Sequence, residues 1–271
     1  MPTLEAVNAV IEALWPLDGA EGWDAPGLLV GDPDSSVTRI LLAVDAVMDT
    51  ADEAVDLEAD LLFVHHPLLL RGVTTVAETT TKGAVIARLI RGGTALVAAH
   101  TNADRVATGT SRVLAERLGL VDQQPLVPGV TPHTGLGIVG RSPQPITLVS
   151  LARLLSDILP HTAGGIRVAG DHDTVVETIA LCAGAGDSLL GVEAVRAADV
   201  YITSDLRHHP ASDAREAMLI GRGPSLVDIS HWAAEWLWLD TAAEQLRREL
   251  PGVEVVTSDL RTDPWDFAVV R

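Results

Sequence analysis

The apolar run Leu61–Val64 constrains the fold of this chain more than any other segment, because His65, His66 and Pro67 follow it at once. A short apolar run of this kind is typical of a strand that is buried on both faces of a sheet. In an open α/β sheet, ligands usually bind beyond the carboxyl ends of the strands. Neutral imidazole is the commonest metal ligand. The two histidines therefore mark a candidate metal site at a strand end.

The adjacency of His65 and His66 restricts how they can act. Successive side chains on a strand point to opposite faces, so a strand that continues through both residues could not aim both imidazoles at one ion. Either the backbone turns at Pro67, or the two imidazoles serve two different ions.

Strand-like and helical patterns alternate along the first part of the chain. Helices are predicted at residues 4–14, 48–57, 83–91 and 111–118, and strands at residues 39–44, 61–64 and 95–99. Strands that alternate with helices at this spacing predict a layered, largely parallel α/β sheet.

The stretch 123–134 is rich in proline and glycine and is the best candidate for a linker. Beyond it, the alternation resumes with strands at 135–140, 166–169, 175–183 and 200–203, followed by a strand at 225–229, a long helix from about His231 to Leu250 and a strand at 253–257. The predicted fold class is α/β, with two layered α/β domains whose sheets are mostly parallel or mixed.

The charge and cysteine content exclude several classes of partner and site. A net charge of -18, with Lys82 as the only lysine, argues against nucleic acid or a membrane surface as a partner, because both require a basic face. The single cysteine, Cys182, excludes a disulfide framework and a cysteine-based zinc site. No signal sequence opens the chain and no run is long enough to span a membrane, so we expect a cytoplasmic protein.

Two further clusters of metal-binding residue types follow apolar strands. His100 and Asp104 come after the strand at 95–99, and His231 and Glu235 open the long helix. Residues four apart on a helix share one face, so His231 and Glu235 can reach the same metal centre. Each pair also has an ordinary structural interpretation, as a helix-surface contact or as a helix cap by Asp104. The occurrence of all three clusters at strand ends favours a site.

The ordered set of motifs resembles the GTP cyclohydrolase 1 type 2 homologs, also called NGG-one-interacting-factor-three-like proteins. The resemblance runs nearly from end to end. Its motifs are Glu21-Gly-Trp23-Asp24, Gly27-Leu-Leu-Val-Gly31, Asp45, His65-His66-Pro67, His100-Thr101 with Asp104, Leu114-Ala-Glu-Arg-Leu-Gly119, Gly170-Asp171, Gly184-Ala-Gly186, Tyr201-Ile-Thr-Ser-Asp205 with His209, and His231 with Glu235. The chain departs from the family pattern at Ala25-Pro26, Ser204, Ser230 and Trp232, none of which is a proposed ligand.

The resemblance implies a centre of two divalent metal ions, most readily zinc, iron or manganese. His66, Asp104 and Glu235 would hold one ion, and His65, His231 and Glu235 the other, with Glu235 bridging. It also implies a ring-shaped homohexamer. Because these ligands must meet, we expect a discontinuous metal-binding domain, residues 1–125 plus 226–271, with a second α/β domain, residues 126–225, inserted into it.

Four other residues receive supporting roles. Asp45 and His100 are expected to orient ligands or bound water, and Asp205 and His209 to reach the cavity, with a structural role as the alternative for the last two. Two functions remain open. One is a metal-dependent hydrolase acting on a nucleotide-like or phosphorylated small molecule, and the family name suggests GTP cyclohydrolase activity. The other is a metal-binding or metal-delivery protein, or a ring-shaped scaffold for protein partners.

Overall fold

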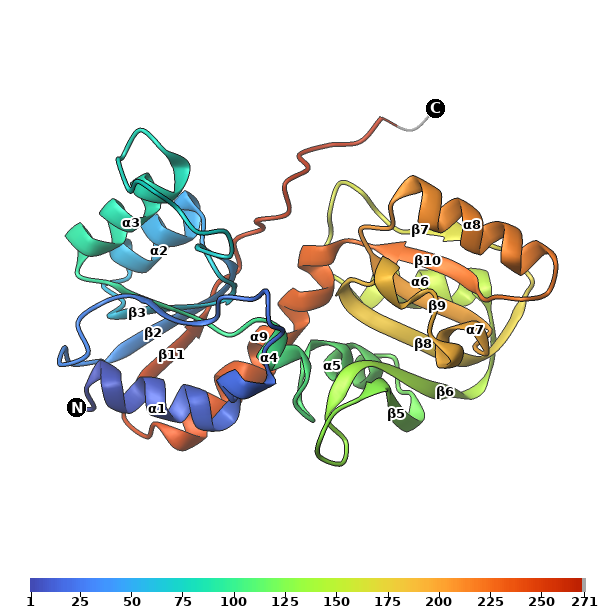
Figure 1. Ribbon diagram of the computed structural model, residues 1–271, viewed down its shortest axis with the longest axis horizontal. Coiled ribbons are helices and arrows are strands. Elements are labelled where there is room, and N and C mark those ends of the chain that lie inside the picture. Colours follow the sequence, from blue (N-terminus) through green and yellow to red (C-terminus); the bar gives the residue numbers. More distant parts are fainter. Residues whose placement is uncertain (270–271) are drawn as a thin grey trace. The chain divides into compact units, whose positions relative to one another are not determined.

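The computed structural model describes residues 1–269 (Figure 1). Contacts between residues divide the chain into two compact units. Unit 1 comprises Met1–Ala103 and Leu239–Thr262, and unit 2 comprises Asp104–Trp238 together with the chain from Asp263 onward. Each unit has its own sheet, which confirms the predicted α/β class with two mixed sheets.

The sheet of unit 1 has the strand order β1-β4-β3-β2-β11. Its strands are β1 (Gly27–Val30), β2 (Arg39–Asp45), β3 (Leu61–His66), β4 (Ala95–Ala98) and β11 (Glu254–Thr257). Strands β4, β3, β2 and β11 are parallel neighbours, and β1 runs antiparallel at the edge. The predicted parallel arrangement therefore holds for the centre of this sheet.

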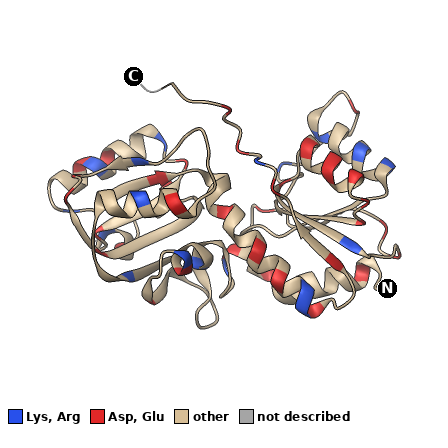
Figure 2. Cartoon of the chain, turned by 180° about the vertical axis from the view of Figure 1, so that it is seen from behind, with Lys and Arg blue, Asp and Glu red and all other residues tan. Residues whose placement is uncertain are grey.

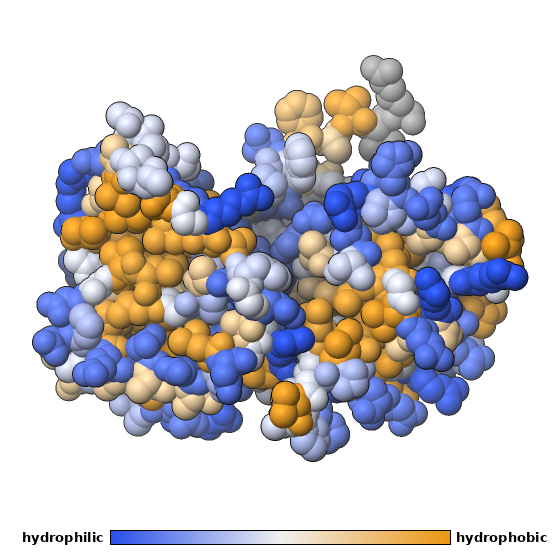
Figure 3. All heavy atoms as spheres, viewed as in Figure 1, coloured by the Kyte–Doolittle hydropathy of each residue, from blue (hydrophilic) through white to orange (hydrophobic). Residues whose placement is uncertain are grey.

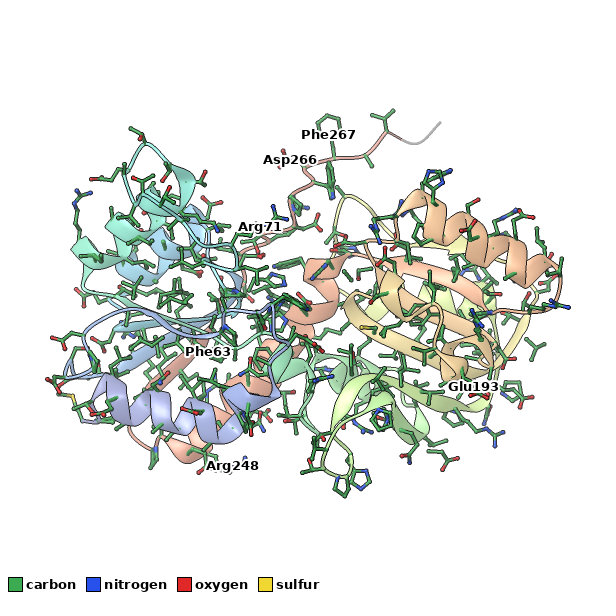
Figure 4. All side chains as sticks on the ribbon, in the orientation of Figure 1. Phe63, Arg71, Glu193, Arg248, Asp266 and Phe267 are labelled. Carbon is green, nitrogen blue, oxygen red and sulfur yellow. The ribbon has the colours of Figure 1, made fainter. Side chains whose placement is uncertain are left out.

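Helices cover both faces of the unit 1 sheet. Figure 1 shows α2 (Met48–Asp56) and α3 (Thr81–Gly92) on one face, and α1 (Leu4–Leu14) with the last part of α9 (His231–Glu249) on the other. Because both faces are covered, Leu61–Val64 in β3 is fully buried. Phe63, labelled in Figure 4, stacks on Trp15 with ring centroids 5.2 Å apart.

The sheet of unit 2 has the strand order β5-β6-β8-β9-β10-β7. Its strands are β5 (Val121–Pro128), β6 (Gly135–Thr147), β7 (Arg167–Ala169), β8 (Val175–Ala185), β9 (Val200–Ser204) and β10 (Ser225–Ile229). Strands β8, β9 and β10 are parallel, whereas β5, β6 and β7 pair in antiparallel fashion.

Besides the first part of α9, unit 2 contains several other helices. They are α5 (Thr110–Arg117), α6 (Leu148–Ile158), α7 (Glu193–Arg196) and α8 (His208–Leu219), with 3-10 turns at Leu17–Gly19 in unit 1 and Asp187–Leu189 in unit 2. Residues of the loop after β8, of α7 and of α8 pack around the buried side chains Cys182, Tyr201 and Leu226. A short helix, α4 (Thr101–Asp104), ends where unit 2 begins.

The first half of the predicted linker at 123–134 belongs to a strand. Residues 121–128 form β5, which pairs with β6 alone and so lies at the edge of its sheet. Proline is tolerated in an edge strand, since its missing N–H can face away from the partner strand. The sequence placed domain boundaries after residues 125 and 225. The contacts change units after Ala103 and within α9, because β5 and β10 belong to the second sheet.

The surface matches the acidic composition. Acidic residues are distributed over both units in Figure 2, in keeping with 37 acidic residues against 19 basic ones. Hydrophilic side chains cover much of the face drawn in Figure 3, with apolar areas between them. No helix among residues 1–269 combines the length and apolarity needed to cross a membrane.

Candidate metal centre

Three histidines converge at the carboxyl edge of the unit 1 sheet. His65 and His66 are the last residues of β3, and His100 follows the neighbouring parallel strand β4. Their candidate ligand nitrogens all lie within 4.8 Å of one another. The ring centroids are 5.0 Å apart for His65 and His66, 5.2 Å for His65 and His100, and 5.4 Å for His66 and His100. This trio has the composition and spacing of a metal-binding cluster.

Each imidazole of this trio is oriented through its Nδ1 atom by an oxygen acceptor. The three pairs are His65 Nδ1 with the Ala99 carbonyl at 2.9 Å, His66 Nδ1 with Asp45 Oδ1 at 2.7 Å, and His100 Nδ1 with Asp24 Oδ1 at 2.8 Å. An acceptor at Nδ1 favours the tautomer that carries its proton there, which leaves Nε2 as the nitrogen able to bind a metal.

Asp45 and Asp24 are themselves held in place. The hydroxyl of Thr262 donates to Asp45 Oδ2, and the Thr101 amide donates to Asp24 Oδ2 over 3.0 Å. Burial opposes the charge of Asp24, but hydrogen bonds from His100 and Thr101 outweigh it and hold the pKa of this carboxyl well below its usual range. Asp24 is therefore an anion at neutral pH.

Two ligand candidates of unit 2 lie one turn apart on α9. His231 Nε2 lies 2.9 Å from Glu235 Oε1, and His231 Nδ1 lies 2.7 Å from Asp205 Oδ2. Burial opposes protonation of His231, but the charge of Glu235, the hydrogen bond with Asp205 and the hydrogen bond with Glu235 raise the pKa of His231 well above its ordinary value. A metal ion at Nε2 would replace the proton that this negative environment favours.

Gly184, the second-to-last residue of strand β8, leaves room for these side chains. Its φ of +82° lies in the left-handed region, and a Cβ atom at this position would lie 2.6 Å from Glu235 Oε1 and 3.4 Å from His231 Nε2. Only glycine allows the backbone to approach the carboxylate this closely. The Gly184-Ala-Gly186 motif was recognisable in the sequence, but the close approach of Gly184 to Glu235 was not.

Asp104, the remaining ligand candidate, is the last residue of α4 and the first residue of unit 2. The Thr110 hydroxyl donates a hydrogen bond of 2.5 Å to Asp104 Oδ1. Burial, reinforced by the negative charges of Asp104 and Glu235, raises the pKa of the Cys182 thiol to about 12. Both carboxylates therefore lie close enough to the buried thiol to disfavour its ionisation.

Of the remaining predicted site residues, His209 is placed apart from this group. It lies at the start of α8, where its ring contacts His208 with centroids 5.2 Å apart, and it lines a cavity formed by α7, α8 and the loop before β10. Asp24 and the Ala99 carbonyl are the contributors that the sequence did not single out. The Trp23-Asp24 motif was visible, but its contact with His100 spans 76 positions of sequence.

The donor set of both units fits divalent transition metals. Imidazole nitrogen with carboxylate oxygen suits zinc, iron or manganese, whereas magnesium and calcium prefer oxygen alone. His65, His66 and His100 in unit 1, and His231 with Glu235 in unit 2, supply these donors. The protein thus falls into the class of α/β proteins with two units, each of which carries candidate metal ligands.

The comparisons with known proteins identify the family. The family model described as Duf34/NIF3 (NGG1p interacting factor 3) matches residues 2–264, and the chain belongs to this family. The "GTP cyclohydrolase 1 type 2 homolog" of Streptomyces coelicolor is 46% identical over 98% of this chain and 94% of its own. The resemblance drawn from the sequence motifs is confirmed.

Solved structures share the fold over their whole length. A hypothetical protein of Staphylococcus aureus is similar with a TM-score of 0.88 and 25% identity, covering 99% of this chain and 100% of that one. A Bacillus cereus protein related to NIF3 is similar with a TM-score of 0.87 over 98% of this chain and 99% of that one, and at 23% identity this shows the fold alone.

Proposed function

We propose that His65, His66, Asp104, His231 and Glu235 are ligands of two divalent metal ions, and that the protein is a metal-dependent hydrolase of a nucleotide-like or phosphorylated small molecule. On the family pattern, His66 and Asp104 would bind one ion, His65 and His231 the other, and Glu235 would bridge. Zinc, iron and manganese are the ions that suit this donor set.

The observation that carries the proposal is the orientation of the histidines. His65, His66 and His231 each have Nδ1 against an oxygen acceptor at 2.7 to 2.9 Å. Histidines that bind metals almost always donate this second N–H to a carboxylate, a backbone carbonyl or water. The same arrangement in three histidines on two elements is best explained by a common role of their Nε2 atoms.

Bound divalent ions would supply polarisation of a substrate oxygen and activation of a water molecule. The chain's own contribution is to orient the ligands through Asp45 and Asp205 and to keep the carboxylate of Glu235 buried against Gly184. A phosphorylated substrate is the natural class, because the ions would offset its charge in a chain of net charge -18. The name of the Streptomyces coelicolor relative, GTP cyclohydrolase 1 type 2 homolog, makes GTP one candidate.

Metal content and turnover test the proposal together. Elemental analysis of the purified protein would be combined with a panel of nucleotides and phosphoesters, using Glu235→Gln and, as the matched control on the same helix, the exposed Glu244→Gln. We expect loss of metal and of turnover in Glu235→Gln alone. Equal metal content in the two variants would refute the assignment of Glu235.

A double variant tests the sharing of ligands between two ions. Replacing His65 and His231 together should remove about half of the bound metal, because the other ion keeps His66 and Asp104. Unchanged metal content would contradict the ligand assignment.

A second function is supported by the family description, which names an interacting factor. A metal-binding or metal-delivery protein, or a ring-shaped scaffold, would bind metal tightly without turning over any member of the panel. We also propose a cytoplasmic homohexamer, on the family pattern. Light scattering of the purified protein would measure the assembly, and a monomer would refute that part of the proposal.

A further inference from the structure

A cavity of about 440 Å³ lies in unit 2 and involves none of the candidate metal ligands. It is formed by the loop after β8, the end of α7, one side of α8 and the loop that leads into β10. Pockets of roughly 300 to 1,000 Å³ are the usual size for small-molecule sites. The cavity is thus large enough for a small organic ligand.

The apolar part of the lining comes from small or compact side chains. It consists of Leu190, Pro210, Ala214, Ala217 and Pro224. Leu190 and Ala214 also pack on the hydrophobic core of the unit, so this part of the lining is anchored to the sheet. Such a surface can accept the apolar body of a ligand but gives it no orientation.

Two arginines supply the charge of the cavity. Arg196 at the end of α7 and Arg222 after α8 both line it. Within residues 1–269, neither guanidinium forms an ion pair or a side-chain hydrogen bond. Asp187, which also lines the cavity, is already paired with Arg207 through Nε and Oδ2 at 2.5 Å. In a chain with 37 acidic residues and 19 basic ones, two unpaired arginines at one cavity favour an anionic ligand.

Helix α8 presents polar groups to the same cavity. His209 and Asp213 are four positions apart, and Ala217 follows after four more, so all three lie on one face of the helix. Asp213 makes no side-chain hydrogen bond among the described residues. An ionised carboxylate only accepts hydrogen bonds and repels an anion. The ligand must therefore carry its negative charge at the arginines and a hydrogen-bond donor at Asp213.

We propose that this cavity is a second binding site, which takes a phosphorylated sugar, either free or as part of a nucleotide. The phosphate lies against Arg196 and Arg222, a sugar hydroxyl donates to Asp213, and the remainder covers the apolar lining. Guanidinium groups match phosphate oxygens in geometry as well as in charge. The site is independent of the metal centre, because the two share no residue.

Calorimetric titration of the full-length protein tests the site. Ribose 5-phosphate, AMP and inorganic phosphate would be titrated into the wild type and into Glu235→Gln, which lacks a proposed ligand of the metal centre. Arg215→Gln is the matched control, because Arg215 lies on α8 beside Glu216 and outside the cavity. Thermal unfolding of each variant checks that the fold is intact.

We expect ribose 5-phosphate to bind equally well to the wild type, Glu235→Gln and Arg215→Gln. Arg196→Gln and Arg222→Gln should each weaken binding by roughly tenfold to a hundredfold, as expected for one charged hydrogen bond. Asp213→Asn should weaken binding of ribose 5-phosphate but not of inorganic phosphate. Tighter binding of AMP would identify a nucleotide as the ligand, and equal binding a free sugar phosphate. Absence of saturable binding, its loss in Glu235→Gln, or indifference to both arginine variants would overturn the proposal.

Discussion

Gly184 offers a sharp test of how closely the backbone of β8 supports the candidate metal ligands. In Gly184→Ala, the added Cβ would lie 2.6 Å from Glu235 Oε1, whereas ordinary contact begins at 3.4 Å, so the carboxylate or the backbone must shift by about 0.8 Å. Metal–ligand distances tolerate only about 0.2 Å. The substitution should therefore displace the carboxylate from a position in which it can bind a metal.

Gly184→Ala should lower both the stability of the fold and the affinity for metal. Alanine at a φ of +82° costs about 1–2 kcal/mol of stability in any context. Displacement of a ligand by a neighbouring group should in addition lower metal affinity by about 10-fold to 100-fold. Gly221→Ala is the matched control, because Gly221 has a φ of +70° and no heavy atom within 4 Å of its ideal Cβ. It carries the backbone strain without the clash.

The assay is a competition titration of zinc or manganese against a chelator of known affinity, combined with thermal unfolding. Both variants should unfold at lower temperature than the wild type, but only Gly184→Ala should lose metal affinity. Equal metal affinity of Gly184→Ala and Gly221→Ala would refute a role of the close contact between Gly184 and Glu235 in metal binding. Loss of metal affinity in Gly221→Ala would also refute it, because backbone strain alone would then explain the result.

Three further outcomes follow from the structure. Burial and nearby carboxylates raise the pKa of Cys182 to about 12, so the thiol should resist alkylation at pH 8 until the protein unfolds, and rapid alkylation of the folded protein would contradict its environment. Burial opposes the charge of Asp60, but hydrogen bonds from Thr38 lower its pKa, so Asp60→Asn should cost about 1 kcal/mol at pH 7. This cost should shrink as the pH falls through the lowered pKa, in urea titrations from pH 7 to pH 3. Asp205→Asn should weaken metal binding by about 10-fold or more through the orientation of His231, and unchanged affinity would refute that role.

The helices and strands were predictable from the sequence where the pattern of apolar residues within the segment determines its structure. The apolar runs of β2, β3 and β4 are buried on both faces and stand out in the sequence as strands. The edge strand β5 was missed because its pattern is polar and contains Pro125 and Pro128, and because its pairing with β6 decides its structure. Local propensity is a weak guide where tertiary contacts stabilise a strand.

In the candidate metal site, too, features within one segment could be predicted, whereas contacts between distant segments could not. The histidines at the ends of β3 and β4 were visible because they interrupt apolar runs. Their acceptors were visible only in part. Asp45 ends the neighbouring strand β2, but Asp24 and the Ala99 carbonyl reach His100 and His65 through contacts that no spacing in the sequence encodes.

The adjacency of His65 and His66 has a structural explanation in the order of the strands. Strand β3 extends through His66, which pairs with Asp45 in the ladder, so the backbone does not turn before the second histidine. Because β3 lies between β4 and β2, each imidazole can be oriented by a different neighbour: His65 by the carbonyl that follows β4, and His66 by the carboxylate that ends β2. The two Nε2 atoms are thereby fixed independently of each other. The candidate ligand nitrogens of the two rings still lie within 4.8 Å of each other, so the strand's alternation does not keep the two imidazoles from one metal centre.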